Sequence, residues 1–171
     1  MYALEDISVE IPPGRVVSLI GPNGSGKTTL IKCILGMVRP DKGNIFFDGA
    51  NIRTDNKYRN RIGYMPQIGR YPDNMKIGQV LNMIRNIRGA AGQKTDDELY
   101  RAFNMEAIKE KPMQSLSGGT RQKVSATLAF MFNPDVFILD EPTAGLDPPA
   151  RGKLKKKKKK EKKSGKMGMI K

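Results

Sequence analysis

The chain has 171 residues and a formal net charge of +14, a length that allows one domain with a hydrophobic core and excludes two ordinary domains. No apolar run approaches the roughly 20 residues that span a bilayer, and the single cysteine, Cys33, excludes an intrachain disulfide and favours a reducing compartment. The basic excess lies in residues 151–171, where eleven Lys and one Arg against one Glu give +11 and leave +3 for residues 1–150, so the charge indicates no specific nucleic-acid partner for the domain.

The first part of the chain has the pattern of an α/β region. Alternating apolar residues predict a strand within residues 4–11, and a continuous apolar run predicts a buried strand at 16–20. A helix is expected at 28–38, and further strands are expected at 45–47 and 61–67.

A helical insertion is expected at residues 72–115. One helical face collects the apolar residues Ile77, Val80, Leu81, Ile84 and Ile87. Thr95-Asp96-Asp97-Glu98 has the spacing of a capping box and predicts the start of another helix. Beyond the insertion we expect a helix through 124–132 and a buried strand at 136–139.

A phosphate-binding loop stands between the strand at 16–20 and the helix that follows. It reads Gly21-Pro22-Asn23-Gly24-Ser25-Gly26-Lys27-Thr28-Thr29 and matches G-x-x-x-x-G-K-[ST]. Glycines allow backbone N–H groups to face phosphate oxygens, and the helix N-terminus adds partial positive charge. We expect Lys27 to reach the β- and γ-phosphates, Thr28 to give a hydroxyl to Mg²⁺, and Thr29 to add a phosphate contact. The structural alternative is a glycine turn that only caps a helix.

Two acidic residues follow the buried strand at 136–139. Asp140 ends that strand, where an α/β sheet places its ligand site, and its carboxylate can hold Mg²⁺ through water. Glu141 is suited to orient or deprotonate the attacking water of a phosphoryl transfer. Alone, the pair would also suit an acidic strand end before a turn at Pro142.

A second candidate anion site is the stretch Leu116-Ser117-Gly118-Gly119-Thr120-Arg121-Gln122. Ser117, Gly118 and Gly119 begin a helix with a hydroxyl and N–H groups that no side chain obstructs. An ordinary N-cap would explain Ser117 alone. It would not explain the whole stretch at this distance from the other two motifs.

With these motifs the chain resembles, over residues 3–149, the ATP-binding subunits of ABC transporters. The motifs follow the family's order: Walker A at 21–29, a Q-loop glutamine at Gln67, the signature at 116–122, Walker B through Asp140, and the D-loop Ala144-Gly145-Leu146-Asp147. The resemblance implies a P-loop NTPase core, a mostly parallel sheet flanked by helices, with an N-terminal antiparallel β region and the helical insertion as a subdomain. Thr120 replaces the commoner glutamine.

The resemblance also implies roles for these residues, with ATP and Mg²⁺ as ligands. Glu141 and Gln67 would be catalytic, with Gln67 sensing the γ-phosphate. Thr28, Gln67 and Asp140 would hold the metal. Ser117, Gly118, Gly119 and Asp147 would contact nucleotide in a sandwich formed with a second copy or a homologous subunit.

The implied partners beyond the second subunit are transmembrane permease subunits, contacted through residues 72–115. The implied location is cytoplasmic, peripheral on the inner face of the cell membrane. The segments around Gln67 and Ser117 look like exporter-type subunits, most like the copper-processing transporter ATPase associated with nitrous-oxide reductase.

The C-terminal part departs from the family pattern. The chain contains no histidine, and the position of the family's switch histidine falls just past Lys171, so a C-terminal truncation is expected. Leu154 is the only apolar residue within 153–163, which predicts no hydrophobic face. We therefore expect an ATP-binding domain at 1–150 and a Lys-rich tail at 151–171, disordered or degenerate. The alternatives are a basic arm for nucleic acid or anionic lipid and a solvated end.

The function expected from the sequence is ATP hydrolysis that powers an ABC transporter. A truncated, catalytically impaired nucleotide-binding domain is the first alternative. A nucleic-acid-associated ABC ATPase is less favoured, because such proteins place long coiled coils between Walker A and the signature. Lys27 and Ser117 are only 90 positions apart.

Overall fold

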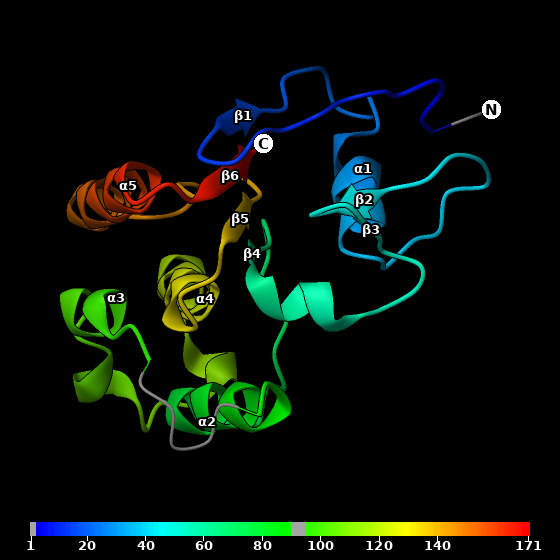
Figure 1. Cartoon of the computed structure of the whole chain (residues 1–171). Coiled ribbons are helices and arrows are strands. Elements are labelled where there is room, and N and C mark those ends of the chain that lie inside the picture. The colour runs from blue at the N-terminus through cyan, green and yellow to red at the C-terminus, as the bar shows by residue number, and fades with distance from the viewer. Residues whose placement is uncertain (1–2, 90–94) are drawn as a thin grey trace.

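The computed structural model of the chain describes residues 3–89 and 95–171 (Figure 1). Its centre is a parallel sheet of four strands in the order β1-β6-β5-β4. The strands are β1 (Val16–Ser18), β4 (Ile62–Met65), β5 (Val136–Leu139) and β6 (Met167–Ile170). Because all four strands run in one direction, their carboxyl ends meet at one edge of the sheet, where such folds bind ligands.

Helices cover both faces of this sheet, and the alternation of β5 shows how. Ile138 packs with Ile31 and Leu35 from the side of α1 (Lys27–Ile34). Phe137 and Leu139 face the opposite way, into the larger core that contains α4 (Gly118–Met131) and α5 (Pro148–Lys163). This period of two in side-chain direction gives a layered α/β fold with two apolar interfaces.

Residues 72–115 form a helical segment between β4 and α4. It contains α2 (Ile77–Ile87), α3 (Glu98–Ala102) and the 3-10 helices η2 (Met105–Ile108) and η3 (Met113–Ser115). Residues 90–94 of this segment lie outside the described residues. The apolar face predicted for α2 is buried at Ile77, Val80 and Leu81. The capping box predicted at Thr95 is wrong in detail, because Asp97 precedes α3 and the Thr95 hydroxyl donates to the Asp97 carboxylate instead.

The N-terminal β region is smaller than expected. No strand forms within residues 3–15 of the structure, and Ile7 and Val9 are 54% and 61% exposed. Within residues 3–61, the antiparallel strand pairing is that of β2 (Phe46–Phe47) with β3 (Ala50–Asn51), followed by the 3-10 helix η1 (Lys57–Arg61). The predicted strand at 4–11 is therefore wrong: alternation alone gives no ladder where no neighbouring strand accepts the hydrogen bonds.

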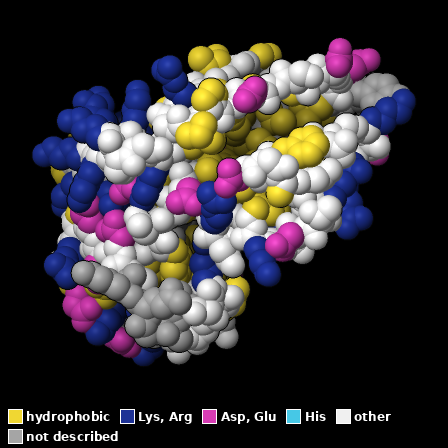
Figure 2. Space-filling view, in the orientation of Figure 1, with side chains coloured by type: hydrophobic (Ala, Val, Ile, Leu, Met, Phe, Trp, Pro, Cys, Tyr) yellow, Lys and Arg dark blue, Asp and Glu magenta, His cyan; other side chains and the backbone are white. Residues whose placement is uncertain are grey.

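The Lys-rich segment is also different from the disordered or degenerate tail expected at 151–171. Residues Pro148–Lys163 form α5, and Met167–Ile170 form β6 in the interior of the sheet. The reason is a stripe at helical spacing that the apolar pattern does not show: Ala150, Leu154, Lys157 and Glu161 are all buried. The exposed lysines of α5 form a dark blue patch (Figure 2).

In the residues that the structure describes, no helix combines the length and apolar character needed to cross a membrane.

Candidate nucleotide site

The phosphate-binding loop joins the carboxyl end of the sheet to the start of α1, as the sequence predicts. Gly26 precedes Lys27, the first residue of α1, and has φ +83°. A Cβ atom there would lie 2.5 Å from the Ala3 carbonyl oxygen. A residue other than glycine at this position would meet both backbone strain and a clash.

The ammonium of Lys27 is turned back onto its own loop. Nζ donates hydrogen bonds to the carbonyl oxygens of Gly21 (2.7 Å) and Pro22 (2.5 Å) and to Ser25 Oγ (3.1 Å). These acceptors hold a positive charge at the centre of a ring of backbone groups. A phosphate that enters the loop can exchange for them, since charge-assisted hydrogen bonds are the stronger kind.

Thr28 and Asp140, the two side chains predicted to hold Mg²⁺ together with Gln67, share one neighbour, Lys171. Lys171 Nζ donates to Thr28 Oγ1 (2.9 Å) and lies 3.1 Å from Asp140 Oδ1. Asp140 Oδ1 is buried and accepts no hydrogen bond from any residue of the described part of the chain. The carboxylate is thus only ionically paired, and a hydroxyl and a carboxylate oxygen are ligands that Mg²⁺ prefers. These side chains fit a bound Mg²⁺.

Gln67 and Glu141, predicted to be catalytic, are in direct contact. Gln67 Nε2 donates to Glu141 Oε2 at 2.9 Å, although the two residues are far apart in sequence. Glu141 has φ +49°, a left-handed conformation that costs a non-glycine residue roughly 1 to 2 kcal/mol. The turn that closes with the Ala144 N–H on the Glu141 carbonyl holds this conformation (3.0 Å). Strain of this kind is typical of functional sites.

The signature residues form a separate cluster with the D-loop. Ser117 is the N-cap of α4 and its Oγ accepts from the Thr120 N–H at 3.2 Å. A Cβ atom on Gly119 would lie 2.5 Å from the Gly145 carbonyl oxygen, so the D-loop backbone approaches the start of α4 closely. Ser117 and Gly118 remain exposed. The cap explains Ser117, while the close approach explains why position 119 is glycine.

Asp147, predicted to contact nucleotide, has two partners within the chain. Its Oδ1 accepts from the Ala150 N–H (2.8 Å) as the N-cap of α5, and its Oδ2 pairs with Lys123 Nζ (2.5 Å). The hydrogen bond from Lys123, followed by the one from Ala150, lowers the pKa of the Asp147 carboxyl. Asp147 therefore connects α4 to α5 in the isolated chain.

Lys171 is the site residue that sequence reasoning missed. No motif marks it, and it follows the short apolar segment Met167-Gly168-Met169-Ile170. The signal that identifies it is topological, because β6 lies beside β5 with Ile170 opposite Leu139. The next residue on each strand, Lys171 and Asp140, therefore meet at the ligand edge.

The loop, the acidic pair and the parallel sheet together define a P-loop NTPase. A sequence profile described as ABC transporter matches residues 4–144. The chain belongs to the ABC transporter family, in the ATP-binding cassette part.

The curated relatives are longer than this chain. The lipopolysaccharide export system ATP-binding protein LptB of Haemophilus influenzae is 34% identical over 160 residues, covering 90% of this chain and 66% of the relative. The zinc import ATP-binding protein ZnuC of Pseudomonas fluorescens is 34% identical over 151 residues, covering 88% of this chain and 54% of the relative. The chain therefore spans between about half and two thirds of the length of these relatives.

Solved structures show the same fold. The structure of an ATP-binding subunit of an ABC transporter has a TM-score of 0.88 at 29% identity, covering 98% of this chain and 72% of the other. A dimeric post-hydrolysis state of the ATP-binding cassette MJ0796, bound to ADP and Pi, has a TM-score of 0.85 at 25% identity, with 99% and 79% covered. The predicted P-loop core with a parallel sheet and separate antiparallel strands is confirmed.

Proposed function

We propose that this chain binds and hydrolyses ATP as one of two cassettes that power a transporter. The observation that carries the proposal is the meeting of four predicted residues at one sheet edge: Thr28 and Asp140 around Lys171, and Gln67 on Glu141. The relatives support it, since two of them are ATP-binding proteins of transport systems and a similar cassette was solved with ADP and Pi.

The chain's residues would divide the work of phosphoryl transfer. Lys27 would leave its loop carbonyls and bind the β- and γ-phosphates, with the loop N–H groups and Thr29 beside it. Thr28, Asp140 and Gln67 would hold Mg²⁺, which neutralises charge on the transferred phosphoryl group. Glu141, oriented by Gln67, would position and deprotonate the attacking water.

The signature would act on the nucleotide of a second cassette. Ser117 and Gly118 are exposed and lie with the D-loop, in a cluster separate from the Lys27 and Glu141 contacts. In this arrangement Ser117, Gly118, Gly119 and Asp147 of one subunit would complete the site of its partner, a second copy or a homologous subunit. The similar cassette MJ0796 was solved as a dimer.

The membrane partner would be a pair of permease subunits, contacted through the helical subdomain at 72–115. Ile87, at the end of α2, is 72% exposed and offers an apolar contact there; Ile68, just before the subdomain and next to Gln67, is 68% exposed. Such a partner would place the chain in the cytoplasm at the inner face of the membrane. The sequence divides the chain into an ATP-binding domain at 1–150 and a tail at 151–171. The tail contributes β6 to the sheet of the ATP-binding domain.

The direction and cargo of transport stay predictions. Named relatives include an export protein and an import protein. The exporter-type assignment therefore stays a prediction, and these names give no support to an association with nitrous-oxide reductase.

The proposed activity is tested with the purified chain. Release of phosphate from Mg-ATP is expected, with loss of about 10²-fold or more in Lys27→Ala and Glu141→Gln. A Lys163→Ala variant, which changes an exposed lysine of α5, is the control. Nucleotide binding without hydrolysis by the unaltered chain would favour the impaired-cassette alternative, and a rate unaffected by Lys27→Ala would contradict the proposal.

The sandwich is tested separately with Glu141→Gln, which slows hydrolysis and should trap the ATP-bound state. Sedimentation with saturating Mg-ATP is expected to show a dimer, and adding Ser117→Arg should return it to monomer. A monomer at every ATP concentration would contradict the two-cassette arrangement.

A further inference from the structure

Lys171 places an ammonium group where the proposed Mg²⁺ ligands converge. Its Nζ lies 2.9 Å from Thr28 Oγ1 and 3.1 Å from Asp140 Oδ1. The three groups come from three segments: the start of α1, the end of β5 and the end of β6. The two oxygen atoms proposed to bind Mg²⁺ are therefore both in contact with the ammonium of Lys171.

The backbone of Lys171 is fixed at this point. Its N–H donates to the Leu139 carbonyl at 3.0 Å, and its own carbonyl accepts from the Glu141 N–H at 3.4 Å. These contacts continue the parallel register of β6 on β5. The sheet thus fixes the backbone of Lys171 beside Asp140, and the Lys171 side chain that reaches the carboxylate is only 12% exposed.

The charge balance of the site explains why a cation belongs there. The Asp140 side chain is 4% exposed and that of Lys171 is 12% exposed. A buried carboxylate is costly unless a positive charge compensates it. The other lysine of the site, Lys27, donates to the carbonyls of its own loop instead.

We propose that Lys171 is a built-in counter-ion that occupies the metal position of the nucleotide-free protein and must move aside when Mg²⁺ binds. The proposal rests on the nucleotide site proposed above and adds a residue that sets its metal dependence. A divalent cation and an ammonium cannot share Asp140 Oδ1 without strong repulsion. Lys171 should therefore weaken Mg²⁺ binding and allow ATP to bind with less dependence on Mg²⁺.

The test measures affinity for a fluorescent ATP analogue with Mg²⁺ and with EDTA. In Lys171→Met, the ratio of the two affinities is expected to rise by roughly tenfold over the unaltered chain, the effect of losing one charge-assisted contact. Lys171→Arg keeps a cation and should behave as the unaltered chain does. Lys163→Met removes the same charge from the exposed end of α5 and is the matched control.

The outcomes separate the two proposals. Equal ratios in Lys171→Met and the unaltered chain, with nucleotide bound by both, would overturn the role of Lys171. Absence of nucleotide binding in every variant would instead contradict the proposed function.

A second measurement needs no nucleotide. In EDTA, thermal unfolding of Lys171→Met, Asp140→Asn and the double variant forms a double-mutant cycle. The double variant is expected to lose less stability than the two single losses added together. Additive losses would overturn the counter-ion, whatever the nucleotide result.

Discussion

Helices α4 and α5 pack on the same side of the sheet with different chemistry. The inner face of α4 is mostly apolar, including Val124, Ala129 and Phe130, and Phe130 stacks on Phe137 of β5 with ring centroids 4.4 Å apart. The inner face of α5 has Ala150 and Leu154 and then turns ionic. The two helices show that one core can be covered by apolar side chains at one helix and by paired charges at the other.

The ionic part of α5 is centred on Lys157, whose side chain is 1% exposed. Its ammonium bonds to the Asp96 carboxylate, and pairs with Glu98 at 3.1 Å and with Glu161 at 2.7 Å. Burial alone would favour the neutral amine, but these partners outweigh it and raise the pKa of Lys157. The contacts with Asp96 and Glu98 fix α5 to the start of α3 and to the residues just before α3.

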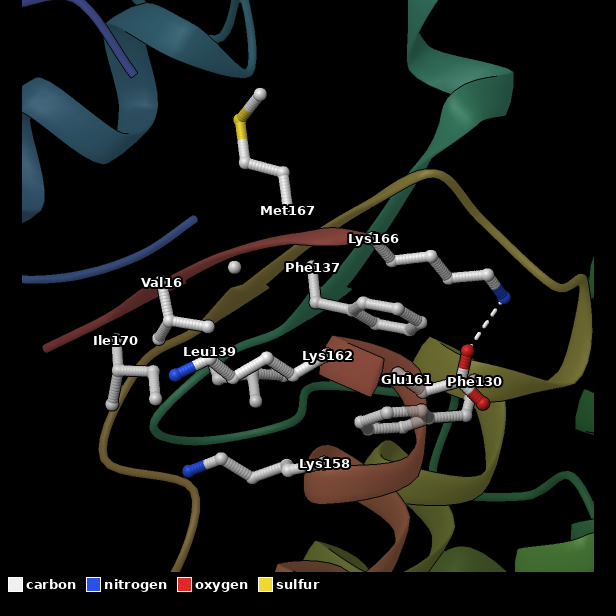
Figure 3. Close-up of a pocket in the computed structure, with 11 residues that line it drawn as sticks. Val16, Phe130, Phe137, Leu139, Lys158, Glu161, Lys162, Lys166, Met167 and Ile170 are labelled. Carbon is white, nitrogen blue, oxygen red and sulfur yellow. Dashed lines mark ion pairs between the residues drawn. The ribbon is translucent and has the colours of Figure 1, made fainter. Parts of the chain in front are cut away.

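The space beneath α5 is incompletely filled. A cavity of about 30 Å³ lies there, lined by Phe130, Phe137 and Leu139 and by Lys158 and Glu161 of α5. Figure 3 draws these side chains. A cavity of this size holds one or two waters and no nucleotide. It is the consequence of lysines standing where an amphipathic helix would present apolar side chains.

The largest effect is expected on the apolar side. Phe130→Ala should lower the free energy of unfolding by about 3 to 5 kcal/mol, because the ring is buried and stacked. Denaturant unfolding measures the change. A loss of unfolding free energy below about 1 kcal/mol would contradict the view that α4 is held mainly by apolar burial.

Leu154→Ala should follow, with a loss of about 2 to 3 kcal/mol, because Leu154 is the one large apolar side chain of α5 and is fully buried. The same unfolding measurement applies, with Lys155→Ala on the exposed face as control. Equal stability of the two variants would mean that α5 is not docked.

Removing the central charge should have a smaller effect. Lys157→Met keeps the length of the side chain and leaves Asp96 and Glu161 without this partner, at a cost of about 1 to 2 kcal/mol. The cost is below that of a fully buried pair because Asp96 is 24% exposed and Glu161 also pairs with Lys166. Lys159→Met, on the exposed face, should change stability by less than about 0.5 kcal/mol.

Acid should weaken the same cluster. Burial opposes ionisation of Asp96, but the hydrogen bonds from Lys157 and from the Glu98 N–H, together with the charges of Lys157 and Lys160, outweigh it and lower the pKa of Asp96. The hydrogen bond from Lys160 lowers the pKa of Glu98. Their stabilisation is therefore present above the unfolded pKa values, near 4, and is lost as the pH falls through the lower folded values. Unfolding at pH 7 and pH 3 measures it, and Lys157→Met should show a smaller difference.

The smallest effect should be a gain. Lys158 lines the cavity, and burial followed by repulsion from Lys155 lowers the pKa of its ammonium. Lys158→Leu would add apolar contact and remove that cost, raising stability by about 1 kcal/mol. Lys159→Leu is the exposed control, and an equal gain in both variants would contradict cavity filling.

Elements that depend on residues close together in the sequence could be predicted. The loop at 21–29, the strand at 136–139 and the start of the helix at Gly118 lie where the motifs indicate. The docking of α5 could not be predicted, because two of the acids that pair with buried Lys157, Asp96 and Glu98, lie about 60 positions away in the sequence. The position of Lys171 beside Asp140 likewise could not be predicted, because it depends on the pairing of β6 with β5.

In the proposed arrangement the loop around Lys27 binds the nucleotide of its own subunit, and Ser117 contacts the nucleotide of the partner subunit. Calorimetric titration of the dilute, monomeric chain with Mg-ATP tests it most directly, comparing Lys27→Ala with Ser117→Ala. We predict that Lys27→Ala weakens binding at least tenfold and that Ser117→Ala leaves it unchanged. Equal binding by the unaltered chain and Lys27→Ala would contradict the claim.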